Sequence, residues 1–164
     1  MSLLSVAQQI QDSYVGTQIR ESQWVFPILC VVHVLGLMIA GGTIAFFDLR
    51  LLGVGLKQTP VSEMARRLLP WTWTGFAVMS VTGVFLIWSE AARLYPNIWF
   101  RAKAVMLVLA GLNVLIFHRS VFRRVGEWDY AAVTPLQARV AGALSLSLWF
   151  GILAVGRAIG YSLD

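Results

Sequence analysis

Six side chains in this 164-residue sequence could bind a cofactor inside an apolar environment. They are His33, Arg101, Lys103, Met106, His118 and Arg157. The two imidazoles and the thioether can ligate iron or copper, and the three cationic groups can neutralise carboxylates. Haem b requires both kinds of group, because its iron takes a histidine or methionine ligand and its two propionates require countercharge. The same cations could instead bind an anionic lipid headgroup or a quinone oxygen.

The composition indicates what kind of protein must position these side chains. Hydrophobic residues make up 58% of the chain and charged residues 13%, with a mean hydropathy of +0.72. Soluble domains carry about 25% charged residues. The composition therefore excludes a soluble enzyme, a disordered chain and a nucleic-acid-binding protein, although the net charge is +5. A basic chain this apolar is typical of a membrane protein with Lys and Arg at the membrane edges.

Four segments are long and apolar enough to cross a bilayer, which takes roughly 20 residues each. We expect these spans over 24–50, 68–92, 97–118 and 138–161, each helical because a single span must satisfy its own backbone hydrogen bonds. The predicted fold is all-α, a polytopic four-transmembrane-helix bundle that forms one domain over residues 1–164. Residues 1–23 have apolar residues at helical spacing, which predicts either an amphipathic helix on the membrane surface or a partly ordered tail.

Prolines and glycines add two expectations about the helices. Pro27, Pro70 and Pro96 are expected at or near first helical turns, where the missing N–H costs little. Small residues that let helix backbones approach closely occur in spans one, two and four. They are Gly36, Gly41, Gly42, Gly75, Gly83, Gly156 and Gly160, of which the last two could also form a contact between copies of the chain.

The distribution of cations predicts the orientation. The segments between spans one and two and between spans three and four hold eight of the thirteen cations: Arg50, Lys57, Arg66, Arg67, Arg119, Arg123, Arg124 and Arg139. Because cytoplasmic loops are enriched in Lys and Arg, we expect both loops in the cytoplasm and both termini in the periplasm of a bacterial inner membrane. Asp48, at the same edge, could pair with one of these arginines.

Helix geometry separates the two histidines. Counted along spans one and three at 1.5 Å per residue, His33 and His118 differ in depth by roughly 24 Å, so they cannot ligate one haem within a subunit. Lys103, Met106 and Arg157 fall near the depth of His33, as does Arg101, which predicts an outer-leaflet site with His33 as the metal ligand. Less specific alternatives remain open. Arg101 and Lys103 could snorkel to the interface, and either histidine could be structural, His33 by bonding to a neighbouring helix and His118 by closing its own.

Three stretches resemble an uncharacterised bacterial family of four-helix inner-membrane proteins. They lie at 20–53, 65–83 and 97–119 and carry the motifs H-x-x-G, D-L-R, F-R-x-K and F-H in that order. The motif residues here are His33, Gly36, Asp48, Arg50, Arg101, Lys103 and His118. More distantly, the early histidine and W-x-R-x-K at 99–103 are similar to HemJ-type protoporphyrinogen oxidases and CopD-type copper-resistance proteins. That resemblance implies a haem- or copper-associated bundle in which His33 and Lys103 matter. The resemblance is incomplete near position 101, where these families have a histidine and this sequence has Arg101.

Three functions are compatible with these residues. The first is a haem b-binding redox protein of the inner membrane that transfers electrons between a quinone and a partner protein. The second is a copper-handling protein that binds copper through His33 and Met106. The third is a non-catalytic accessory or structural subunit of a larger membrane complex or homo-oligomer. The sequence has no HExxH motif, phosphate-binding loop, GxSxG elbow or cysteine pair, so it assigns no catalytic residue and does not decide whether the protein is an enzyme.

Overall fold

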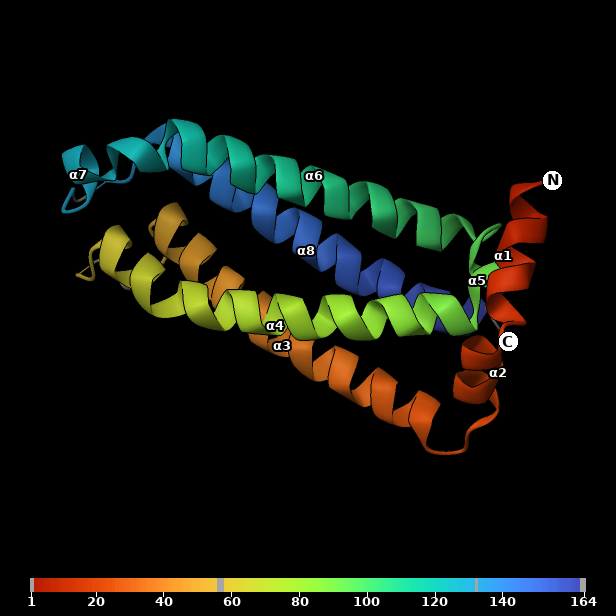
Figure 1. Ribbon diagram of the computed structural model, residues 1–164. Helices are drawn as coiled ribbons and strands as arrows, with labels where there is room; N and C mark the ends of the chain where they lie inside the picture. The colour runs from red at the N-terminus through yellow and green to blue at the C-terminus, as the bar shows by residue number, and fades with distance from the viewer. Residues whose placement is uncertain (1, 56–57, 132, 163–164) are drawn as a thin grey trace.

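The computed structural model describes residues 2–55, 58–131 and 133–162, and Lys57, one of the eight cations used to predict the orientation, lies outside this part. The elements follow one another as a series of helices (Figure 1). These are α1 (Leu3–Gln11), α2 (Tyr14–Glu21), α3 (Val25–Leu52), α4 (Val61–Ser89), α5 (Ala91–Leu94), α6 (Ile98–Ser120), the short 3-10 helix η1 (Phe122–Arg124), α7 (Val125–Trp128) and α8 (Leu136–Ser162). No strand occurs among the described residues.

Four of the helices, α3, α4, α6 and α8, are long and apolar enough to cross a membrane, which confirms the predicted fold class. They run side by side, so both described ends of the chain lie at one end of the bundle (Figure 1). We call this the terminal end. The opposite end, with η1, α7 and the segments at 53–55, 58–60, 129–131 and 133–135, is called the loop end.

The second long helix differs from the sequence prediction at its start. It begins at Val61, after Pro60, seven residues before the predicted span. The expectation that Pro70 lies near a first turn is therefore wrong, because Pro70 lies inside α4. The span was predicted from its apolar residues, and a helix can continue beyond the apolar stretch where Arg66 and Arg67 can reach water.

The long helices form two pairs. α3 packs most extensively on α4 and α6 on α8, and contacts between α3 and α8 join the pairs. At the closest approach of α3 and α4, Gly36 faces Gly75, and a Cβ added to Gly36 would lie 2.9 Å from the Gly75 carbonyl oxygen. Farther toward the loop end, the hydroxyls of Thr43 and Thr72 lie 2.8 Å apart and link the same two helices. Gly41, by contrast, has no neighbour within 4 Å of an added Cβ.

The N-terminal segment forms two helices, α1 and α2, that lie across the terminal end (Figure 1). Of the two alternatives, the surface helix is therefore the one observed. The guanidinium of Arg20 donates to the carbonyls of Gln11 and Ser89, and the side-chain oxygen of Gln11 accepts from the backbone N–H of Ala92. The indole of Trp88 donates to the hydroxyl of Ser13. These bonds attach α1 and α2 to the end of α4 and the start of α5.

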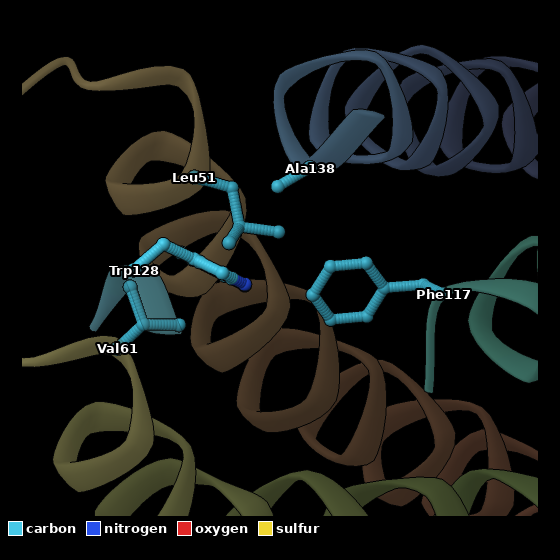
Figure 2. Close-up of a cluster of buried hydrophobic side chains, with 5 residues drawn as sticks. All are labelled: Leu51, Val61, Phe117, Trp128 and Ala138. Carbon is cyan, nitrogen blue, oxygen red and sulfur yellow. The ribbon is translucent and has the colours of Figure 1, made fainter. Parts of the chain in front are cut away.

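A buried apolar cluster closes the loop end (Figure 2). Each of α3, α4, α6, α7 and α8 contributes one buried residue to it, and these are, in that order, Leu51, Val61, Phe117, Trp128 and Ala138. Val61 and Ala138 have no exposed surface at all. Val61, Met64 and Ala65, in the first turns of α4, are buried, and α4 contacts α7. This packing accounts for the early start of the helix.

Candidate functional site

His33 lies in the third turn of α3 with its ring against α4. Its Nδ1 lies 3.0 Å from the hydroxyl of Thr82, a residue only 6% exposed. The Thr82 hydroxyl donates its single proton to the carbonyl of Val78 at 2.7 Å. With the hydroxyl proton directed at Val78, Thr82 accepts from the ring in the tautomer that carries the proton on Nδ1. In that tautomer the lone pair lies on Nε2, the nitrogen through which the imidazole can bind a metal or accept a proton.

Glycine on α4 makes room for this ring. A Cβ added to Gly83 would lie 3.2 Å from His33 Cε1, which is tighter than ordinary van der Waals contact. Gly83 thus has a specific role beside the histidine, and the backbone of α4 can lie directly against the imidazole. Thr82 and Gly83 were not identified as site residues from the sequence. A threonine next to a glycine in an otherwise apolar span was the signal that could have suggested them.

Lys103 is the second predicted residue that the structure brings to this level. It lies in the first turns of α6 and is partly buried, and its charge is close enough to His33 for a direct electrostatic interaction. Its Nζ lies 3.8 Å from the position of an added Cβ on Gly156 of α8, so the ammonium lies over a glycine surface of the neighbouring helix. His33 and Lys103 thus place an imidazole and a cation near the terminal end of the bundle.

The two arginines predicted at this site contact aromatic side chains instead. Arg101 is exposed, and its guanidinium donates to the carbonyl of Tyr95 and lies 5.6 Å from the centre of the Tyr95 ring. Arg157 is also exposed, and it stacks 4.5 Å from the Tyr161 ring and donates to its hydroxyl at 2.8 Å. Both pairs are of the kind found at membrane interfaces, where cation–π contacts hold charged side chains beside an aromatic belt.

The remaining two predicted residues, Met106 and His118, have contacts of their own. The sulfur of Met106 packs on Gly151 of α8, and the side chain joins a buried cluster around Trp149. His118 lies near the loop end of α6, where Nδ1 is 3.0 Å from the Val114 carbonyl. Since a carbonyl only accepts, this bond assigns a proton to Nδ1 of His118 as well. The fifteen residues from Lys103 to His118 span about 22 Å of helix, in keeping with the predicted separation of the histidines.

Asp48 does not form the expected ion pair. Within the part of the chain that the structure describes, it has no salt bridge, and the guanidinium of the nearby Arg50 donates to the carbonyl of Thr59 at 2.9 Å. Asn113 forms the bond between helices that its type suggests, donating to the Ala141 carbonyl at 3.0 Å. Across residues 2–55, 58–131 and 133–162, no three His, Cys, Asp or Glu side chains come together as a metal-binding group.

Comparison with known proteins identifies the family of the chain. No curated protein and no solved structure matches it. A family model does match, over residues 10–162, which include all four long helices and both histidines. The chain therefore belongs to the family of unknown function DUF6644.

Proposed function

We propose that this protein is a haem b-binding redox protein of the bacterial inner membrane, with His33 as the axial ligand. The observation that carries the proposal is the hydrogen bond from His33 Nδ1 to Thr82, which leaves Nε2 as the free nitrogen. Histidines that bind metals are typically held in this way, with the second ring nitrogen donating to a neighbouring acceptor. A bound haem would supply one-electron transfer.

The chain's own residues have defined roles in this proposal. Thr82 orients the imidazole, and Gly83 allows the ring to lie against α4. Lys103 provides a cation near the ring that can neutralise a propionate. Arg101 and Arg157 lie at the same end of the bundle on their tyrosine partners and are available to the second propionate only if those contacts break.

The geometry favours haem over copper as the group bound. A protein copper site needs several side-chain ligands close together, and the described residues contain no group of three His, Cys, Asp or Glu side chains that could hold a metal ion. A porphyrin supplies four nitrogen ligands itself, so one histidine suffices.

Location and partners follow from the same proposal. The exposed arginines Arg119, Arg123 and Arg124 lie at the loop end, so the positive-inside rule places this end in the cytoplasm and His33 in the outer leaflet. Electrons would then pass between a membrane quinone and a partner protein or a second copy of the chain. A role as an accessory subunit requires no bound haem and is the alternative that the following experiment distinguishes.

The test is an absorption spectrum of the protein purified in detergent after expression with added haem precursor, oxidised and then reduced with dithionite. We expect about one haem b per chain, with a Soret band that is lost in His33→Ala. His118→Ala is the matched control, because this histidine lies at the other end of α6, and it should keep the band. A colourless wild-type protein that is folded and helical by circular dichroism would refute the proposal. A band lost only in His118→Ala would move the site to the loop end.

A further inference from the structure

A cavity near the loop end lies between all four long helices and is separate from the His33 region. Its volume is about 120 Å³. Its walls are mainly apolar and include Phe47, Leu68 and Phe117, and the last of these also belongs to the buried cluster of Figure 2. For comparison, an engineered apolar cavity of about 150 Å³ binds benzene. The space is therefore large enough for a six-membered ring or a group of similar size.

Asp48 is one of the residues that line this cavity, and the hydrogen bonding of its carboxyl group is incomplete. Asp48 is 4% exposed, and its Oδ2 is buried without a hydrogen-bond partner, alone in this respect among the described side chains. The other interaction of the carboxylate is with Ser145 on α8. Gly142 allows this close approach, since an added Cβ would lie 3.1 Å from the Asp48 carbonyl oxygen. An unpaired acceptor buried in a membrane bundle is costly, and such residues commonly mark binding sites.

The remaining polar side chains around the cavity are already engaged. The hydroxyls of Thr43 and Thr72 are hydrogen-bonded to each other, and each also lies within hydrogen-bond distance of a carbonyl of its own helix. The amide of Asn113 donates to Ala141, and His118 donates from Nδ1 to Val114. None of these bonds supplies a partner to Asp48 Oδ2.

The cavity is accessible from the lipid side. Leu69 on α4 and Val114 on α6 both line it, and they are 40% and 47% exposed. These two helices belong to different pairs and share no extensive contact. A molecule dissolved in the bilayer could therefore enter between α4 and α6.

We propose that this cavity binds a small membrane-soluble molecule with a hydroxyl group on an apolar ring, as in phenols and hydroquinones. The carboxyl group of Asp48 turns Oδ2 toward the cavity to accept from the hydroxyl, and the ring packs against the apolar walls. The site is independent of the haem proposal, because Asp48 lies fifteen residues along α3 from His33, or about 22 Å. An uncharged ligand fits the walls better than a cation, which would require several oxygen ligands around it.

The test compares two probes of similar shape, para-fluorophenol and para-fluorotoluene, of which only the first can donate a hydrogen bond. Binding to the full chain in phosphatidylcholine nanodiscs is followed by fluorine NMR, with empty nanodiscs as the blank. We expect the wild-type protein to bind fluorophenol roughly tenfold more tightly than fluorotoluene, as one hydrogen bond to a buried carboxylate allows. Asp48→Leu removes the acceptor at similar size and should abolish this preference.

A second pair of variants tests the cavity without touching Asp48. Val114→Phe fills the opening and should weaken the binding of both probes. Val108 lies on the same helix, is 62% exposed and does not line the cavity, so Val108→Phe should leave the binding of both probes unchanged. This pair decides the question even if Asp48→Leu does not fold. Equal affinities of the wild-type protein for the two probes, or equal effects of the two phenylalanines, would overturn the proposal. The proposal would also be overturned if the wild-type protein were more stable in sodium than in potassium and Asp48→Leu removed this difference, since the site would then bind a cation.

Discussion

The contact between Gly36 and Gly75 allows a quantitative test of how α3 and α4 pack. In Gly36→Ala, the new Cβ would lie 2.9 Å from the Gly75 carbonyl oxygen, 3.0 Å from the Met79 nitrogen and 3.1 Å from Val78 Cγ1. Two of these neighbours are backbone atoms, so the strain cannot be relieved by rotating a side chain. The first contact is 0.5 Å shorter than the 3.4 Å at which ordinary van der Waals contact begins, and the helices must therefore separate.

The size of the effect follows from two opposing contributions. Overpacking by one methyl group costs about 1–3 kcal/mol, whereas alanine is favoured over glycine within a helix by up to about 1 kcal/mol. We therefore expect Gly36→Ala to lower the free energy of unfolding by about 1–2 kcal/mol. The matched control is Gly42→Ala on the same helix, where an added Cβ has no neighbour within 4 Å. In Gly42→Ala only the higher helix propensity of alanine acts, so the free energy of unfolding should stay the same or rise slightly.

Both variants can be measured by unfolding the purified protein in mixed micelles with increasing SDS, followed by circular dichroism. The decisive quantity is the difference between the two alanine variants, which should be about 2 kcal/mol with Gly36→Ala the less stable. If both substitutions change stability by the same amount, the close approach of α3 and α4 at Gly36 does not contribute as described, and the reasoning fails.

Two further substitutions test contacts at the terminal end. Thr82→Val keeps the side-chain volume but removes the acceptor for His33 Nδ1, so haem affinity should fall about tenfold or more while the fold is retained; unchanged affinity in a haem titration would show that Thr82 does not orient the ring. Arg20→Ala removes the bonds to the carbonyls of Gln11 and Ser89 at a cost of about 1 kcal/mol. Limited proteolysis should then cut faster between α1 and α2, and an unaltered cleavage rate would mean that other contacts hold the segment.

The overall architecture was predictable because the bilayer restricts it so strongly. Apolar segments of sufficient length must be helices in a membrane, and the cofactor candidates could be placed in depth from the rise of 1.5 Å per residue alone. The level shared by His33 and Lys103 and the distance to His118 follow from this arithmetic. The contact between Arg157 and Tyr161 was also accessible, since residues four apart lie on one helix face.

What could not be predicted depends on how the helices rotate against each other. Thr82 contacts His33 because of the face that α4 turns toward α3. Neither helix has a strongly one-sided apolar pattern, so the sequence does not specify which face that is. The isolation of Asp48 is a similar case. Three arginines, Arg50, Arg66 and Arg67, follow it in the segment between the first two spans, but Arg50 is directed to Thr59 by the path of the segment after α3. The expected and the observed site therefore differ in the directions of the side chains and not in their depths along the helices.

The pairing of the long helices also bears on how the chain is assembled. The first pair, α3 with α4, is complete when residue 89 has been synthesised, and its tightest contact needs nothing from the second half of the chain. The second pair can form on its own and then dock through α8, using Gly142 against Asp48. The short segment around α5 is therefore the natural place to divide the gene, and two separately expressed hairpins should reassemble in the membrane into one functional unit.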